Sequence, residues 1–359
     1  MVGVVDKLDG VQRRVPPLGL PIAVIYKYFD DQGPYLAAIV TYYAFVAIFP
    51  LLLLATSILG FVMQGDPALY QKVLDSALAQ FPVIGDQLGR PEGLQGSTGA
   101  VVAGILIAFY GSLGLGTAIQ NAMNIAWSVP RNSRPNPFLL RLKSLLLLVI
   151  TGTALFAVTT ISVLLRETKA FGGEQSSAMK WLITVINVLL VAAVLAFLLR
   201  LASAHDHSWW HAIPGALLVA VLWQVLQVVS ARYVDRVLGQ TSSMNQTFGL
   251  ILGLVGLIFV AATIGILGIE LNVVIVRRLW PRALLTPFTD SVHLTSADRE
   301  AYTSYARAQR HKGFEEVTVK FAKSPRQEAD EAAAVAEAEQ SSPARESEKP
   351  APRGDTREN

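Results

Sequence analysis

Long runs of apolar residues, separated by shorter polar stretches, dominate the middle of the chain. The first run extends from Leu36 to Val62 and contains no charged residue. A helix of that length spans roughly 40 Å, whereas the hydrocarbon core of a bilayer is about 30 Å thick. Pro50 lies near the middle of the run, and a proline there frees the carbonyl of Val46 and bends the helix. The pattern therefore predicts a bent membrane-spanning helix.

Five more apolar runs follow, so the pattern predicts six membrane spans. The expected ranges are 36–62, 98–127, 144–165, 181–202, 212–234 and 248–276. We therefore expect an all-α, polytopic integral membrane protein whose six-span membrane domain covers 36–283. Between the first two spans, residues 67–81 carry apolar side chains at helical spacing, which predicts an amphipathic helix outside the membrane.

The segments that flank this domain are more polar. Within the N-terminal segment 1–35, residues 18–29 are compatible with an interfacial helix that uses Lys27 and tyrosines as membrane-surface anchors, and equally with an ordinary lead-in to the first span. Residues 284–323 form a second expected cytoplasmic segment. Residues 324–359 are rich in Glu, Ala, Ser, Pro and Arg, and they contain too little apolar surface to offset the entropy of ordering. We expect this charged tail to be disordered.

Composition and charge support this class and give an orientation. The chain is 52% hydrophobic and 16% charged, and it contains no cysteine, which excludes disulfides and thiolate metal sites. Twelve basic residues flank the spans on the side of the N-terminus, against seven on the opposite side. Basic loops stay in the cytoplasm. The chain is therefore expected in a bacterial inner membrane with both termini cytoplasmic.

Several polar residues lie within the expected spans, where they are costly and usually face protein or water. The alternation of spans places them all in the inner part of the membrane. They are Thr41, Tyr42, Tyr43, Asn121, Asn124, Arg200 and Glu270. We hypothesise a polar cluster in which Glu270 either pairs with Arg200 or binds a proton or a cation.

Small residues recur along the sixth span. Gly249, Gly253 and Gly256 begin a seam that reaches Glu270 at spacings of three and four, and Gly265 and Gly268 lie on an adjacent stripe. Such stripes let helix backbones approach closely in membranes. We interpret these glycines as helix-packing positions.

Motifs for enzymatic chemistry are absent from the sequence. His205, His207 and His211 could supply imidazole ligands to a metal, but their spacing is not a specific zinc signature. A cytoplasmic loop with Trp209 and Trp210 at the level of the lipid headgroups explains them better. No nucleophile elbow, zinc-protease motif or phosphate loop occurs. We expect neither a cofactor nor an enzymatic activity.

Several motifs resemble the YihY/BrkB family of bacterial inner-membrane proteins across roughly residues 20–283. They are Leu36-Ala-Ala, Tyr42-Tyr43, Phe49-Pro50-Leu-Leu, Pro214-Gly215-Ala216-Leu217, Leu222-Trp223, Tyr233 and Gly268-Ile-Glu270-Leu-Asn272. The resemblance implies six spans. Some members carry the label ribonuclease BN, generally regarded as mistaken, and others are linked to serum resistance or envelope lipid export. The loop before Pro214 is usually basic in the family but is histidine-rich here.

These observations favour a transporter or binder of an amphiphilic envelope molecule, such as a lipid or glycolipid precursor. Membrane lipids and this substrate are the expected partners, and nucleic acid is not. The alternatives are a non-transporting protein that organises envelope proteins and a membrane-embedded hydrolase or nuclease. The sequence assigns neither a coupling ion nor an oligomeric state.

Overall fold

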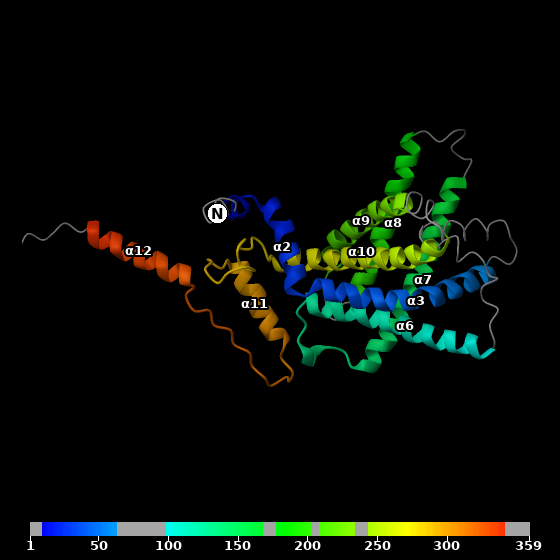
Figure 1. The fold of residues 1–359 in the computed structure, drawn as a ribbon, viewed down its shortest axis with the longest axis horizontal. Helices are drawn as coiled ribbons and strands as arrows, with labels where there is room; N and C mark the ends of the chain where they lie inside the picture. Colours follow the sequence, from blue (N-terminus) through cyan, green and yellow to red (C-terminus); the bar gives the residue numbers. More distant parts are fainter. Residues whose placement is uncertain (1–8, 63–97, 168–176, 203–207, 234–242, 342–359) are drawn as a thin grey trace, which may run out of the picture.

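The computed structural model describes residues 9–62, 98–167, 177–202, 208–233 and 243–341. Helices account for nearly all regular structure in these ranges, which contain no strand (Figure 1). The expected all-α fold is therefore confirmed for the described part of the chain. The amphipathic helix expected over 67–81 lies outside it.

Six long helices build the membrane domain. They are α3 (Gly33–Val62), α6 (Thr98–Ala126), α7 (Pro137–Glu167), α8 (Ser177–Ala202), α9 (Trp209–Tyr233) and α10 (Ser243–Arg277). Each packs against the next in chain order, and α10 packs back against α3, so the helices form a closed ring. Figure 1 shows α10 and α3 side by side with α6 beneath them.

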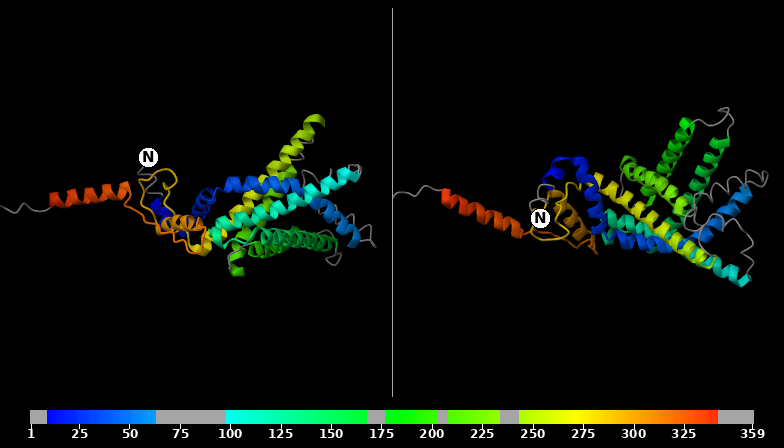
Figure 2. Two further views of the ribbon diagram at one scale, coloured as in Figure 1. Left: turned by 90° about the horizontal axis from the view of Figure 1, so that it is seen from below. Right: turned by 45° about the horizontal axis from the view of Figure 1, so that its top comes forward.

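Length and apolarity make four of these helices able to cross a membrane. The qualifying segments are Pro137–Ala154, Trp181–Ala202, Trp209–Arg232 and Ile251–Arg277. In α3, the apolar stretch Gly33–Ile48 is shorter. Each expected span coincides with a long helix, although α7 begins at Pro137, seven residues before the expected start at 144. The count of six spans stays a prediction. The helix α3 continues across position 50 and changes direction in its second half (Figure 2).

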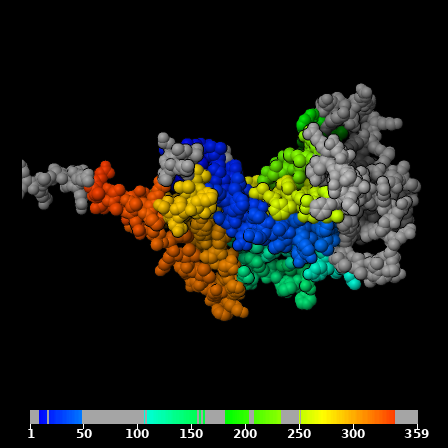
Figure 3. Space-filling model, in the orientation of Figure 1, coloured from blue at the N-terminus to red at the C-terminus, as the bar shows by residue number. Residues whose placement is uncertain are grey.

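A smaller layer covers one end of the ring. It consists of α2 (Pro16–Asp30), residues 278–295 and α11 (Ser296–Ala308), and we call it the terminal cap. In α2, prolines occupy the first positions, where a missing N–H costs nothing. In α11, a capping box joins Thr295 and Asp298. The space-filling view shows α2 between α11 and the ring (Figure 3).

The interior between cap and ring is apolar and continuous. Its core contains Ala23 from α2, Trp127 from the end of α6, Val273 from α10 and Ala301 from α11. Each of these residues is at most 1% exposed. One face of α2 therefore packs into the body, while Leu18, Ile25 and Phe29 on the same helix are exposed. A short 3₁₀ turn, Arg131–Ser133, lies beside α11.

One part of the expected disordered tail forms a helix. Helix α12 spans Pro325–Ser341 and extends away from the body (Figure 1). Ser324 and Gln327 exchange capping hydrogen bonds at its start, and most of the residues that follow are Ala, Glu or Gln, which are good helix formers. Its middle residues are exposed, so local propensity rather than burial supports it. Residues 342–359 lie outside the described ranges.

Candidate functional site

Glu270 lies on α10 where the ring meets the terminal cap, and its side chain is completely buried. Neither carboxylate oxygen has a hydrogen-bond partner among the described residues. The nearest cation is Lys27 of α2, whose Nζ lies 3.4 Å from Glu270 Oε2. The expected partner Arg200 is elsewhere: its guanidinium lies 4.2 Å from the centre of the Trp209 ring. The pairing of Glu270 with Arg200 is therefore not what the structure contains.

Lys27 joins Glu270 to a second carboxylate. Its Nζ also lies 2.5 Å from Asp31 Oδ2, one helical turn further along the chain. The side chains of Lys27, Asp31 and Glu270 are 1%, 2% and 0% exposed. Burial raises the pKa of the Asp31 carboxyl, and the Lys27 ammonium opposes that rise. We call these three residues the Lys27 cluster.

A second ionic group lies next to the first and holds the terminal cap together. Arg282 Nε lies 2.5 Å from Asp298 Oδ1, and its Nη2 lies 3.0 Å from Asp30 Oδ2. The other Asp298 oxygen accepts hydrogen bonds from the backbone N–H groups of Ala283 and Thr295. Asp298 therefore fixes the start of α11 and the chain that follows α10 at the same time.

A tyrosine of α11 lies beside each of the two groups. The Tyr305 ring lies 5.2 Å from Lys27 Nζ, and the Tyr302 ring lies 5.5 Å from the Arg282 guanidinium. Burial, followed by the nearby carboxylates Asp31 and Asp30, raises the pKa of Tyr305. Both phenols thus stay neutral at physiological pH and keep the charges in aromatic surroundings.

The remaining polar candidates do not join the Lys27 cluster. Thr41 donates to the Ala37 carbonyl of its own helix, and Tyr42 is 61% exposed. Tyr43 lies beside Tyr110 of α6. Asn121 accepts a hydrogen bond from Arg134, whereas Asn124 is buried with an unpartnered Oδ1.

The two motif segments Pro214–Leu217 and Gly268–Asn272 meet where α9 crosses α10. A β-carbon on Gly215 would lie 2.0 Å from the Gly268 carbonyl oxygen, and one on Gly268 would lie 2.3 Å from Val219. Asn272 accepts from the Gly215 N–H at 2.7 Å and donates to the Ala212 carbonyl. Because Pro214 disturbs the ladder of α9, this amide supports the helix at its weakest point.

The other expected packing glycines differ in their surroundings. No described atom lies within 4 Å of a β-carbon built on Gly256 or Gly265. Gly249 and Gly253 are half-buried. Close packing also occurs on α6, where a β-carbon on Gly114 would overlap the Tyr43 ring and one on Gly116 would overlap Ser144.

The histidine candidates fall mostly outside the described residues. His205 and His207 lie there, and His211 lies exposed on the first turn of α9. The described residues contain no group of three or more His, Asp or Glu side chains that could hold a metal ion. The neighbouring Trp209 and Trp210 are 47% and 78% exposed.

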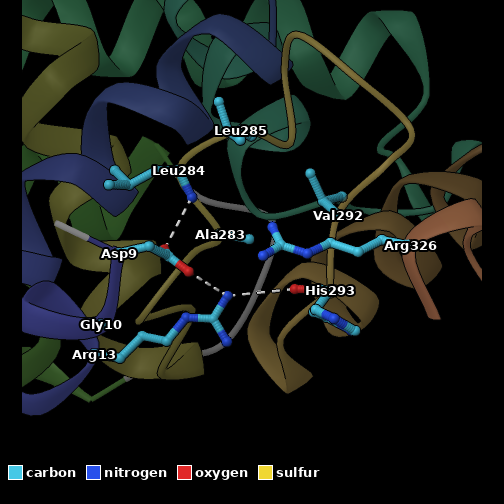
Figure 4. A pocket seen from close by; sticks show the side chains of 9 residues that line it. All are labelled: Asp9, Gly10, Arg13, Ala283, Leu284, Leu285, Val292, His293 and Arg326. Carbon is cyan, nitrogen blue, oxygen red and sulfur yellow. Dashed lines mark hydrogen bonds and ion pairs between the residues drawn. The ribbon is translucent and has the colours of Figure 1, made fainter. Parts of the chain in front are cut away.

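A pocket of about 250 Å³ opens in the terminal cap (Figure 4). Its charged side chains are already engaged with protein groups. Arg13 pairs with Asp9 at 2.6 Å and donates to the His293 carbonyl, and the His293 ring lies 2.7 Å from Asp330. These contacts therefore hold the residues before α2, the segment after α10 and the start of α12 together.

Sequence reasoning identified Glu270 but missed most of the groups around it. The missed residues are Lys27, Asp30, Asp31, Arg282, Asp298 and Tyr305. One signal was available, because Lys27 and Asp31 are an oppositely charged pair at i, i+4 beside an apolar helix. The others come together only when α10, α2 and α11 pack.

The apolar ring with a buried ionic cluster defines a polytopic helical membrane protein. A sequence model described as Virulence factor BrkB matches residues 24–287. The chain therefore belongs to the BrkB family, as the resemblance of its motifs indicated. No curated protein and no solved structure matches it.

Proposed function

We propose that this BrkB-family membrane protein moves or binds an amphiphilic envelope molecule, such as a lipid or glycolipid precursor. The observation that carries this proposal is the completely buried carboxylate of Glu270 in a predominantly apolar helix, where it is the one acidic residue. A carboxylate is expensive in such a place, and it is usually kept where it acts on a transported species or a coupled ion.

The two halves of an amphiphile match two parts of the protein. Large apolar side chains are exposed along α7, α8 and α9 and offer a surface for acyl chains, among them Val149, Trp181 and Val225. The charged groups lie at the end of the ring that the terminal cap covers. The sequence contains no phosphate loop. An ion gradient, a partner or the substrate gradient would therefore supply the energy.

The orientation belongs to the same proposal. From the bias of basic residues we infer a cytoplasmic terminal cap, two cytoplasmic termini and a ring in the inner membrane of a bacterial cell. The Lys27 cluster then lies at the cytoplasmic end of the helices. Enzymatic activity and nucleic-acid binding form no part of the proposed function.

Flux in proteoliposomes tests the proposal. Purified full-length protein is reconstituted with a panel of fluorescent envelope lipids, and movement between leaflets is followed by quenching from outside. We expect movement of at least one lipid above that in protein-free vesicles, and a lower rate with Glu270→Gln. Gly256→Ala is the matched control on α10, because its β-carbon would meet no described atom. Wild-type rates equal to those of empty vesicles for every lipid would overturn the proposal.

A second candidate, organisation of envelope proteins, is favoured by α12. This helix is exposed and extends from the body, where a partner can reach it. Affinity capture with the full chain and with a chain that ends at residue 323 distinguishes this role from lipid movement. A partner lost on truncation, together with no lipid flux, would favour this role, whereas capture that survives truncation would count against it.

A further inference from the structure

The Lys27 cluster contains one more acid than base. Lys27 lies between Asp31 and Glu270, at 2.5 Å and 3.4 Å from their oxygens. All three side chains are at least 98% buried. With every group ionised, one ammonium faces two carboxylates, and an uncompensated buried charge is strongly unfavourable.

The surrounding charges do not remove this surplus. Asp30 and Asp31 come from the end of α2, Arg277 from α10, Arg282 from the segment after α10, and Tyr305 and Asp298 from α11. Neither α3 nor α6 contains a charged residue. Across both ionic groups three cations face four carboxylates, and the exposed Glu300 of α11 adds a fifth beside Arg277. A single bound proton leaves the Lys27 cluster itself neutral, with one ammonium and one carboxylate.

Hydrogen bonding decides where that proton resides. Asp298 accepts from Arg282 and from two backbone N–H groups, so both of its oxygens already have donors. Asp30 is 22% exposed, pairs with Arg282 and retains contact with water. Glu270 accepts no hydrogen bond from the described residues. The surplus negative charge therefore falls on Asp31 and Glu270.

We propose that Asp31 and Glu270 share one bound proton, with Lys27 as a fixed ammonium between them, and that this proton holds α2 against α10. The proton is taken from water and returned to water, with no covalent change elsewhere. A metal cation does not suit the site, because the Lys27 ammonium already lies against both carboxyls and would repel it.

Loss of the proton has a structural consequence. Two carboxylates would then face each other in an apolar core with one ammonium for both, and their repulsion would act across the α2–α10 contact. Burial already raises the pKa of Asp31. A carboxyl whose pKa is raised by folding contributes most to stability at low pH, and that contribution is lost as pH rises through the raised pKa. The site is thus a pH-sensitive junction between cap and ring.

Infrared difference spectroscopy on the purified full chain in detergent tests the proposal without any transport assay. The carbonyl stretch of a buried, protonated carboxylic acid is expected at neutral pH and disappears reversibly as pH rises. Glu270→Gln and Asp31→Asn should each remove this band, because the remaining carboxylate pairs one-to-one with Lys27. Lys27→Met should enlarge it, because both carboxyls are then protonated. Asp330→Asn is the matched control, because it removes an exposed carboxylate that belongs to neither ionic group, and it should leave the band unchanged.

Thermal unfolding across pH gives a second readout. Wild-type protein should lose melting temperature as pH rises, and Glu270→Gln should show a flatter profile. Absence of a protonated-carboxyl band in the folded wild type would overturn the proposal on its own, whatever the variants do. Persistence of the same band in both single variants would also overturn it. A lipid-transport experiment that fails leaves these spectra untouched, so the two proposals are tested separately.

Discussion

Substitution of Gly215 by alanine tests the crossing of α9 and α10 most directly. The added β-carbon would lie 2.0 Å from the Gly268 carbonyl oxygen and 2.6 Å from the Asn272 amide nitrogen. Both neighbours are held in place, one by the backbone of α10 and the other by its own hydrogen bonds. The helices must therefore separate by about 1.5 Å or more to reach ordinary van der Waals contact at roughly 3.5 Å.

The cost combines two effects. Overpacking of a tight contact costs about 1–3 kcal/mol. Separation also lengthens the hydrogen bond between the Gly215 N–H and Asn272 Oδ1, which contributes about 0.5–1.5 kcal/mol. We therefore expect Gly215→Ala to lower the stability of the folded protein by roughly 2–4 kcal/mol.

Thermal unfolding of the purified protein in one detergent measures this loss. Gly256→Ala provides the control, since it makes the same chemical change on α10 where no described atom lies within 4 Å. We expect a clear fall in melting temperature for Gly215→Ala and no fall for Gly256→Ala. Equal melting temperatures for the two variants would refute the close crossing and the reasoning built on it.

Three further predictions concern other parts of the chain. Thr295→Ala removes the N-cap of α11 and should lower stability by about 1 kcal/mol, measured by thermal unfolding, and an unchanged melting temperature would contradict this. Deletion of 324–359 should leave monodisperse protein on size exclusion, because α12 is exposed, and aggregation would show that the tail packs on the body. A reporter fused to the C-terminus should be active in the cytoplasm, and one placed at Gly85 should be active on the opposite side of the membrane. Activity of both reporters on the same side would exclude six spans.

The helices could be predicted from the sequence because membrane spans follow from local apolar length alone. The run from Leu36 to Val62 and the long final span needed no tertiary information. The C-terminal tail shows where reasoning from composition alone was not enough. Composition correctly marks 325–341 as unable to bury a core, but it does not weigh the capping pair of Ser324 and Gln327 that starts α12.

The partner of Glu270 illustrates what sequence reasoning lacked. Arg200 was chosen because span topology placed it at a similar depth. Lys27 was assigned to the membrane surface, where long basic side chains usually extend to water. The structure instead buries Lys27, because α2 packs its apolar face against α10 and brings the ammonium to two carboxylates. Helix packing, rather than position along a span, decides this pairing.

Asn272 was recognisable from the sequence as part of a motif, but not as a side chain that hydrogen-bonds to the backbone of α9. Its position on the stripe that contains Gly268 indicated packing. That its amide would bind backbone groups of Ala212 and Gly215 depends on how closely α9 approaches α10. No spacing within either segment encodes this distance.

The closure of the ring by α10 onto α3 has a consequence for biogenesis. Helices emerge from the ribosome in order, so α3, the first helix of the ring, meets α10, the last, only when synthesis is nearly finished. Until then Lys27 and Asp31 pair with each other alone, and the backbone of α9 lacks the amide of Asn272. Insertion of α10 thus closes the ring, brings the Asn272 amide to α9 and brings Glu270 to Lys27 in one event. A nascent chain stalled before that helix would present an open seam to the quality-control proteases of the membrane.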